Sequence, residues 1–159
     1  MIVDDLIDIE QIKNVRQAYS AHFDTHNVEA LAALFTEDAV CEFGGGYGTW
    51  VGRDEIRNNY VKALADIGEP FDAIHIVTNP WITLVDRINA HGRWYLLDLL
   101  TRQWPQTNLT TRGRHDNPLL FLGIYEDDYR KIDGQWLIAY TKLHFLWPAR
   151  TYTALRHTN

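Results

Sequence analysis

The sequence contains a single cysteine, Cys41, among its 159 residues. One cysteine excludes an intramolecular disulfide and a metal site built on several thiolates. No apolar run approaches the ~20 residues that a membrane-spanning helix needs. The acidic N-terminal segment MIVDDLIDIE also lacks the basic and apolar pattern of a secretory signal. We therefore expect a protein that folds without disulfides in the reducing cytoplasm and has no membrane partner.

Basic residues are few, 15 against 21 acidic residues, and the formal net charge is −6. This charge argues against nucleic acid as a partner, because its phosphates need a basic footprint. The sequence has no Gly-x-Gly-x-x-Gly motif, no P-loop and no Gly-x-Ser-x-Gly motif. His22 and His26 are four residues apart, but they belong to no HExxH motif. We therefore expect neither a cofactor nor a metal ion.

Aromatic residues are plentiful at 13% of the chain, and hydrophobic residues reach 46%. This composition and length are typical of one globular domain, which we expect to span residues 1–159. A chain of this size buries enough surface to be stable without a disulfide or metal. The aromatic residues fit either an ordinary core or an apolar ligand cavity.

Apolar residues recur every three or four positions in the first part of the chain, which predicts helices. The expected helices span residues 5–24, a short stretch behind Asn27 as N-cap that reaches Phe35, and residues 53–67. Beyond residue 71 the pattern is that of strands. We expect them at residues 40–43, 50–51, 73–79, 81–86, 90–101, 119–130 and 135–145, with Pro80 dividing the third from the fourth.

The polar residues 102–118 are predicted to form a loop, and Asp133-Gly134 a hairpin turn. The tail, residues 149–159, is expected either to fray or to form an interface. Helices followed by a meander of long strands imply an α+β fold with the helices on one face of a curved sheet.

Four segments resemble a known family. They are AYSAHFDTHNVEALAALFTEDAV (18–40), GTWVGRDEIRNNY (48–60), IHIVTNPWI (74–82) and GIYEDDYRKIDGQWLI (123–138). Together they resemble the SnoaL-like branch of the NTF2-like superfamily. The resemblance implies an NTF2-like, cystatin-like cone, in which N-terminal helices pack on a strongly curved, mixed and mostly antiparallel sheet.

Catalytic members of this branch include scytalone dehydratase, bile acid 7α-dehydratase and γ-hexachlorocyclohexane dehydrochlorinase. They eliminate a small group across a C–C bond without metal or organic cofactor. By resemblance, Asp24 and His75 match their shared acid and histidine, Tyr19 matches the tyrosine of the dehydratases, and Asp98 matches an aspartate of the bile acid enzyme. The sequence departs from scytalone dehydratase, which has a histidine where Asp98 stands, and from the dehydrochlorinase, which has a lysine near the position of Tyr19.

The residue types fit acid–base chemistry. An aspartate bonded to one nitrogen of His75 would fix its tautomer, so that the other nitrogen could take a proton from a substrate carbon. Tyr19 could stabilise charge on a substrate oxygen. Asp98 lies in the apolar segment WYLLDLL, and a carboxyl group kept protonated there could protonate a departing hydroxyl. Each residue also has an ordinary structural explanation, as a core histidine, a core tyrosine or a surface carboxylate.

Further aromatic residues are candidates for a substrate pocket. Trp94 shares strand parity with Asp98, and His144 shares parity with Trp136 and Ile138 on the last strand. Other candidates lie near the glycine run 44–46. The predicted pocket residues are Phe43, Tyr47, Trp50, Trp94 and His144.

We therefore predict a cofactor-independent lyase or isomerase that acts on a small hydrophobic cyclic substrate. The alternatives are a non-catalytic protein that binds small molecules and a structural partner like the β subunit of ring-hydroxylating dioxygenases. An apolar outer sheet face and the segment Trp147-Pro148 would need cover. We expect a homotrimer or a homodimer, as the resemblance implies.

Overall fold

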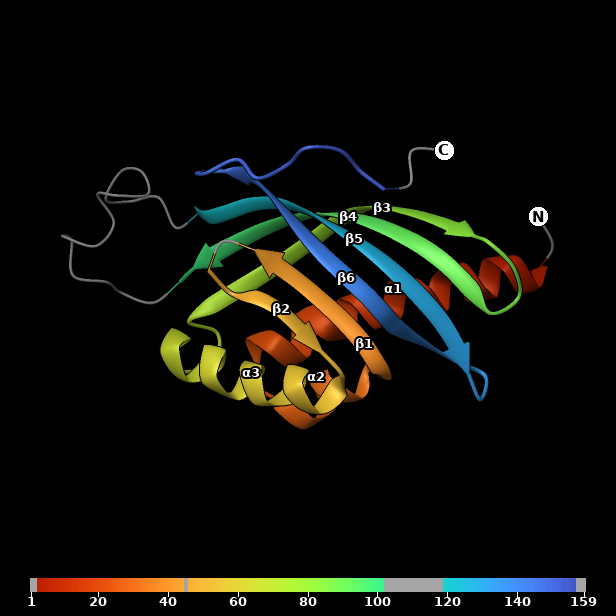
Figure 1. Ribbon diagram of the computed structural model, residues 1–159, viewed down its shortest axis with the longest axis horizontal. Coiled ribbons are helices and arrows are strands. Elements are labelled where there is room, and N and C mark those ends of the chain that lie inside the picture. The colour runs from red at the N-terminus through yellow and green to blue at the C-terminus, as the bar shows by residue number, and fades with distance from the viewer. Residues whose placement is uncertain (1–2, 45, 102–118, 157–159) are drawn as a thin grey trace.

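The computed structural model describes residues 3–44, 46–101 and 119–156 (Figure 1). The predicted polar loop 102–118 lies outside these residues. In the described part, helices come first and a large sheet follows, as the sequence predicts.

Three helices pack on one face of the sheet (Figure 1). They are α1 (Val3–Asp24), α2 (Val28–Ala33) and α3 (Arg53–Ile67). The side chain of Asn27 accepts a hydrogen bond from the backbone N–H of Ala30 at 3.2 Å, so the predicted N-cap is confirmed. The predicted bounds of α3 are also confirmed.

Among the described residues, the sheet has six strands in the order β2-β1-β6-β5-β4-β3. Their bounds are β1 (Phe35–Gly44), β2 (Gly48–Val51), β3 (Ala73–Leu84), β4 (Asn89–Leu100), β5 (Leu119–Ile132) and β6 (Gln135–Trp147). Strand β1 runs parallel to β6, and every other neighbouring pair is antiparallel. The sheet is therefore mixed, mostly antiparallel and open, and the predicted α+β fold is confirmed.

Two predicted strand boundaries are wrong. Phe35 begins β1 instead of ending the short helix, because it pairs with Ile138 in the parallel ladder with β6. Pro80 does not divide two strands, because β3 continues through it with an irregular register between Thr78 and Trp81. Strand β3 forms one edge of the sheet, where a residue without a backbone N–H is tolerated.

The core lies between α1 and the inner face of the sheet. Ile12 of α1, Trp94 of β4 and Ile138 of β6 are all at most 1% exposed. Their positions follow from the two periods: residues of α1 three or four apart face the sheet, and alternate residues of each strand face the helix. This packing determines which side chains can reach the space between the helices and the sheet.

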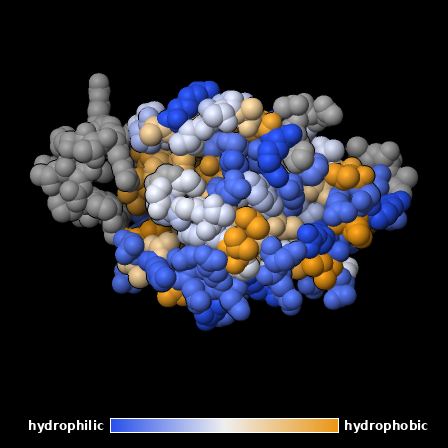
Figure 2. All heavy atoms as spheres, in the orientation of Figure 1, coloured by the Kyte–Doolittle hydropathy of each residue, from blue (hydrophilic) through white to orange (hydrophobic). Residues whose placement is uncertain are grey.

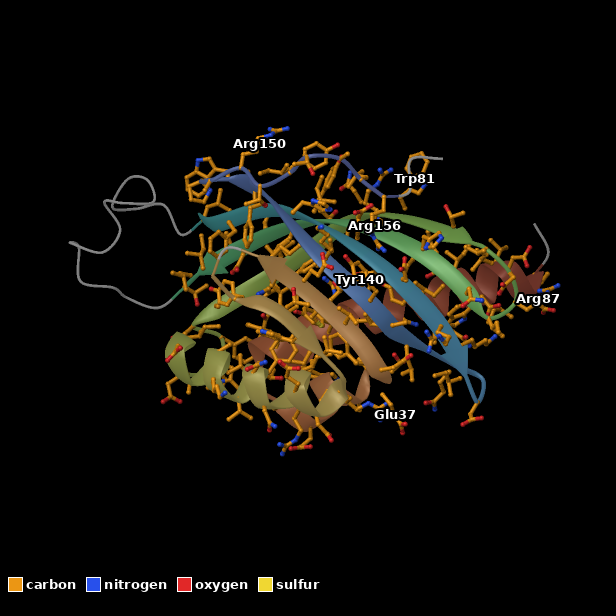
Figure 3. The ribbon with its side chains drawn as sticks, viewed as in Figure 1. Glu37, Trp81, Arg87, Tyr140, Arg150 and Arg156 are labelled. Carbon is orange, nitrogen blue, oxygen red and sulfur yellow. The ribbon has the colours of Figure 1, made fainter. Side chains whose placement is uncertain are left out.

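The outer face of the sheet is less apolar than the sequence predicts. Over β5 and β6 it carries charged side chains, and the described part of the tail, up to residue 156, covers part of it. The backbone N–H groups of Thr151 and Arg156 donate to Phe145 O and to the Glu126 carboxylate at 3.0 and 2.7 Å. The Arg156 guanidinium also lies 3.9 Å from the centroid of the Tyr140 ring (Figure 3).

Exposed hydrophobic side chains remain near the β3 edge of the sheet, where Ile76, Trp81 and Tyr95 are each more than 40% exposed. Elsewhere the visible surface is mostly hydrophilic, and hydrophobic residues occur in small groups (Figure 2). The predicted apolar outer face is thus limited to the side of the sheet near β3.

The packing of α1 leads to a prediction about stability. Ile12 is fully buried, whereas Ile7 on the same helix is 50% exposed. We expect Ile12→Ala to lower the free energy of unfolding by about 2–5 kcal/mol, because it leaves a cavity under the helix. The matched variant Ile7→Ala should change it by less than about 0.5 kcal/mol. Urea unfolding measures both, and equal losses would contradict this packing of α1.

Candidate functional site

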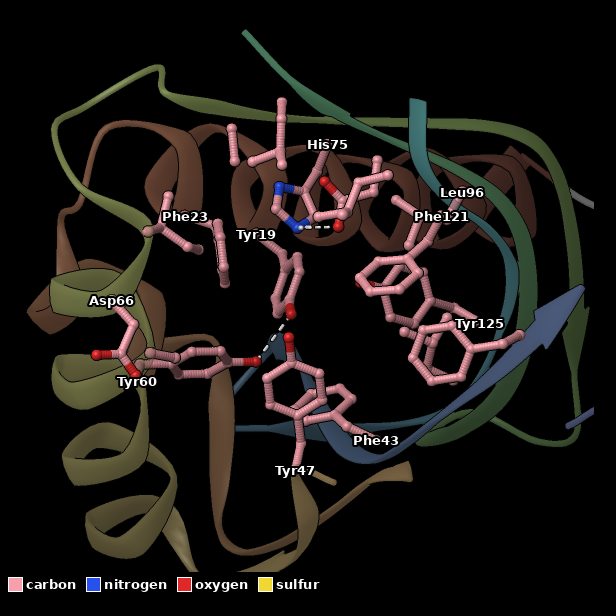
Figure 4. Close-up of a pocket in the computed structure, with 18 of the residues that line it drawn as sticks. Tyr19, Phe23, Phe43, Tyr47, Tyr60, Asp66, His75, Leu96, Phe121 and Tyr125 are labelled. Carbon is pink, nitrogen blue, oxygen red and sulfur yellow. Dashed lines mark hydrogen bonds and ion pairs between the residues drawn. The ribbon is translucent and has the colours of Figure 1, made fainter. Parts of the chain in front are cut away.

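A cavity of about 300 Å³ lies between the helices and the inner face of the sheet (Figure 4). This volume is at the small end of the range for ligand pockets. Its walls are mainly apolar and aromatic, and every helix and strand except α2 contributes. The lining residues are Tyr19, Phe23, Phe43, Tyr47, Trp50, Tyr60, Ala63, Asp66, Ile67, Ala73, His75, Leu96, Asp98, Leu100, Leu120, Phe121, Tyr125, Leu143 and Phe145.

The predicted contact between Asp24 and His75 is present. Asp24 is the last residue of α1, and its Oδ1 lies 2.9 Å from His75 Nδ1. The backbone N–H of His75 donates to both carboxylate oxygens, at 3.1 and 3.2 Å. Because these contacts hold the ring at Nδ1, the Nε2 atom is left on the side away from Asp24.

Asp98 lies on the other side of the imidazole. His75 of β3 and Asp98 of β4 are paired across the ladder, and His75 Nε2 is 3.7 Å from Asp98 Oδ2. This distance is too long for a hydrogen bond, but it is short enough for a strong charge interaction in a buried place. His75 and Asp98 are 8% and 7% exposed. The imidazole is therefore flanked by two carboxyl groups, with Asp24 at hydrogen-bond distance and Asp98 further away.

The imidazole also has an apolar neighbour. The ring of Phe23 packs against it, with ring centroids 4.1 Å apart. Phe23 precedes Asp24 on α1 and lines the cavity. The contact keeps water from one side of the ring and fixes its tilt.

Tyrosine hydroxyls form a second polar group in the cavity. The Tyr19 and Tyr60 oxygens lie 2.8 Å apart, and both side chains are almost completely buried (Figure 4). Burial raises the pKa of Tyr19 to about 12, while Arg16 and hydrogen bonds with Tyr60 and Tyr125 act in the opposite direction. Burial also raises the pKa of Tyr60 and of Tyr125 well above the usual range. All three phenols are therefore neutral near pH 7 and able to donate hydrogen bonds.

Tyr60 and Tyr125 were not predicted as site residues. Tyr60 lies on the apolar stripe of α3, and Tyr125 stands opposite Trp94 in the β4–β5 ladder. Helical and strand periods place both side chains inward. Neither period shows that the hydroxyl of Tyr60 lies next to the hydroxyl of Tyr19. That contact depends on how α3 is packed.

Three of the five predicted pocket residues line the cavity, and two do not. Phe43, Tyr47 and Trp50 line the cavity, and Tyr47 extends toward it from the β1–β2 connection (Figure 4). Trp94 does not line it. Its indole N–H instead donates to the hydroxyl of Tyr129 at 3.2 Å, deeper in the core. Trp94 has the predicted inward orientation, but it lies too far along β4 to reach the cavity.

The prediction that His144 lines the pocket is wrong. The register of β5 and β6 shifts next to the pair formed by Tyr129 and Ile138, so strand parity changes beyond Ile138. His144 consequently lies on the outer face, where its Nε2 is 2.8 Å from a Glu126 carboxylate oxygen. The ring of Tyr152, from the tail, covers it with ring centroids 5.7 Å apart.

Within residues 3–44, 46–101 and 119–156, no cluster of three or more His, Cys, Asp or Glu side chains is arranged to hold a metal ion. No helix in these segments is long and apolar enough to cross a bilayer.

The family model for the SnoaL-like domain matches residues 4–142, which is most of the chain. The chain belongs to the SnoaL-like domain family. The resemblance seen in the sequence is therefore confirmed.

Solved structures with the same fold include proteins of different kinds. A protein of unknown function from Mycobacterium tuberculosis is 28% identical, with a TM-score of 0.71, and the match covers 89% of this chain and 73% of that one. A protein from Novosphingobium aromaticivorans, provisionally named a scytalone dehydratase, is 23% identical, with a TM-score of 0.74 and coverage of 96% and 94%.

A hexachlorocyclohexane dehydrochlorinase, LinA-type3 from Novosphingobium barchaimii, is 16% identical, with a TM-score of 0.71 and coverage of 99% and 98%. At identities of 23% and 16%, the similarity to the two proteins from Novosphingobium shows a common fold. It leaves the reaction of this SnoaL-like protein open.

Two histidines, His75 and His144, are buried in the described part of this SnoaL-like protein, and they lead to a prediction about tautomers. His75 contacts its carboxylate through Nδ1, and His144 contacts its own through Nε2. In the neutral rings we expect the proton on Nδ1 of His75 and on Nε2 of His144, because each carboxylate needs a donor. Nitrogen-15 NMR of labelled histidine distinguishes the tautomers. The same tautomer at both positions would contradict this geometry.

Proposed function

We propose that this protein is a cofactor-independent lyase or isomerase that acts on a small, hydrophobic, cyclic compound, with His75 as general base. One observation carries the proposal: Asp24 holds His75 through Nδ1, and the ring lines an apolar cavity beside a second carboxyl group, Asp98. In this arrangement Nε2 is the basic atom, and Asp24 stabilises the imidazolium that forms.

The proposed elimination begins at a carbon next to a carbonyl group. His75 Nε2 takes the proton from that carbon, and the electron pair of the C–H bond is delocalised onto the carbonyl oxygen as an enolate. The same electron pair then forms the new C=C bond. The bond to a hydroxyl on the adjacent carbon breaks, and this group leaves as water after receiving a proton from Asp98. The proton on His75 then passes to Asp98, 3.7 Å away, so that both groups recover their starting states.

Tyr19 is the proposed donor to the carbonyl oxygen. Negative charge develops on that oxygen while the proton leaves the neighbouring carbon, and a hydrogen bond that strengthens at this point lowers the barrier. Tyr60, 2.8 Å from Tyr19, keeps the Tyr19 oxygen in place. If Tyr60 donates to that oxygen, the proton of Tyr19 is free to bond the substrate.

The cavity walls support a hydrophobic, cyclic substrate. Rings such as Phe43, Trp50 and Phe121 suit the faces of a ring compound, and about 300 Å³ limits its size. An apolar enclosure also strengthens the charge interactions of His75 with the carboxyl groups beside it. The names of two proteins with the same fold, a dehydratase and a dehydrochlorinase, denote elimination of water and of hydrogen chloride.

Two probe reactions can separate the base from the acid. In 5-nitrobenzisoxazole, a base removes the C–H proton while the N–O bond breaks to give a stable phenolate, so no acid is needed. A cyclic β-hydroxy ketone requires protonation of its departing hydroxyl as well. A reaction of the first probe alone reports on His75, and a reaction of the second reports on His75 and Asp98.

We expect His75→Gln to lower kcat for both probes by about 100-fold or more, because general base catalysis contributes about 10²–10⁴-fold. We expect Asp98→Asn to lower kcat strongly for the hydroxy ketone and weakly for 5-nitrobenzisoxazole. The control is His91→Gln on the outer face, where His91 Nδ1 contacts Asp128 at 2.8 Å, and it should leave both rates unchanged. Product absorbance and NMR measure the two reactions.

Full activity of His75→Gln would contradict the proposed base. If wild-type protein binds the hydroxy ketones without converting them, the alternative function as a small-molecule-binding protein is favoured. Isothermal titration calorimetry of the wild type and of His75→Gln measures this binding directly, since substitution at His75 leaves the aromatic walls in place.

A further inference from the structure

A buried positive charge lies behind two of the tyrosines that line the cavity. Arg16 is completely buried on α1, three residues before Tyr19. Its guanidinium carbon is 3.5 Å from the centroid of the Tyr125 ring and 4.2 Å from that of Tyr19. Both rings line the cavity, whereas Arg16 is not among the lining residues. The rings of Tyr19 and Tyr125 therefore lie between the charge of Arg16 and the cavity.

The negative partner of Arg16 is held by other groups. Arg16 Nε lies 3.6 Å from Asp127 Oδ2, which is longer than a hydrogen bond. The hydroxyls of Tyr129 and Thr141 each donate to the Asp127 carboxylate at 2.7 Å. None of the guanidinium nitrogens has a hydrogen-bond partner among the described residues. The Arg16 guanidinium is stacked on phenol rings, and its carboxylate partner is not hydrogen-bonded to it. Its positive charge is therefore only partly neutralised and acts on those rings.

The field of Arg16 acts on the hydroxyl that the proposed mechanism uses. Burial raises the pKa of Tyr19, and Arg16 is the strongest influence in the opposite direction. Arg16 also lowers the pKa of Tyr125 against the effect of burial. A more acidic phenol is a stronger donor to a negatively charged oxygen. A cation close behind the rings also favours negative charge in front of them.

We propose that Arg16 is a positioning residue that makes the Tyr19–Tyr60 end of the cavity selective for an anionic oxygen, as in an enolate or a phenolate. This inference rests on the proposed function, because the enolate is the species that forms when His75 removes a proton. It adds the ligand class: compounds whose ring oxygen carries negative charge bind more tightly than their neutral forms.

The probe is 4-nitrophenol, whose anion absorbs near 400 nm whereas the neutral form does not. We expect the wild-type protein to bind the anion more tightly than the phenol, so that the bound probe ionises at a lower pH than the free probe. A titration of absorbance against pH, with and without protein, gives the ratio of the two affinities. This measurement requires no turnover.

Charge changes at the ion pair should move this ratio in opposite directions. The double variant Arg16→Met with Asp127→Asn removes both charges together, so that no buried carboxylate is left without its cation. We expect the preference of this variant for the anion to fall by about tenfold. Asp127→Asn alone removes only the negative charge and should raise the preference. Arg16→Lys keeps the cation and should retain most of it. Structural damage alone would not produce both signs.

A remote charge provides the control. Lys131 contacts Asp8 at 2.6 Å, away from the cavity lining, and Lys131→Met should leave the preference unchanged. Near-ultraviolet circular dichroism checks that each variant is folded. The proposal is overturned if the doubly substituted protein keeps the wild-type preference, or if wild-type protein fails to bind 4-nitrophenolate more tightly than the phenol. A fully active His75→Gln variant would instead refute the proposed function, whatever the titration shows.

Discussion

The contact between Asp24 and His75 joins two parts of the chain that are 51 residues apart. It fastens the end of α1 to the beginning of β3, and a backbone hydrogen bond from Phe71 to Asp24 O at 2.7 Å reinforces the junction. A carboxylate is unfavourable at the C-terminus of a helix, because the helix dipole is negative there. The His75 ring and backbone N–H compensate for this cost. Since α1 is held at this point, Tyr19 and Phe23, within the preceding two turns, must face the same cavity.

Charged groups on the two faces of the sheet have different surroundings. On the inner face Arg16 and Asp127 are fully enclosed, and their charges lie behind the walls of the cavity. On the outer face Glu126 and Asp128 contact Arg156 of the tail, which lies near the surface. Arg156 and Asp128 are partly exposed, so solvent weakens their contact, whereas the Glu126 side chain is buried against His144. Low polarizability around the inner pair preserves its field, so that charge can influence the cavity.

Much of the fold could be predicted from local pattern. The helical period gave the bounds of α3, and Asn27 marked the start of α2, because a cap and a repeat are properties of neighbouring residues. The bulge near Ile138 could not be predicted, since a single additional residue in β6 depends on the register with β5. That shift moved His144 to the outer face. The strand period correctly predicted that Trp94 faces inward, but it could not predict that Trp94 lies outside the cavity lining.

The site was predictable to a similar degree. Resemblance singled out Tyr19, Asp24, His75 and Asp98 as candidates, and Tyr19, His75 and Asp98 line the cavity. Nothing in the helical pattern indicated that Arg16 would be fully buried, because an arginine on a helix is normally exposed. Its position depends on Tyr125 and Asp127, which lie more than a hundred residues further along the chain.

Several exceptions to the usual rules of folding lie around one cavity. Asp24 ends a helix, Asp98 interrupts an apolar strand, and Arg16 carries its charge into the core. Each of these choices opposes stability when considered alone. Together they surround one imidazole and one pair of phenols with charges of both signs in an apolar enclosure. Stability alone would favour apolar side chains at Asp98 and Arg16, and their presence beside the cavity agrees with the chemistry proposed for it.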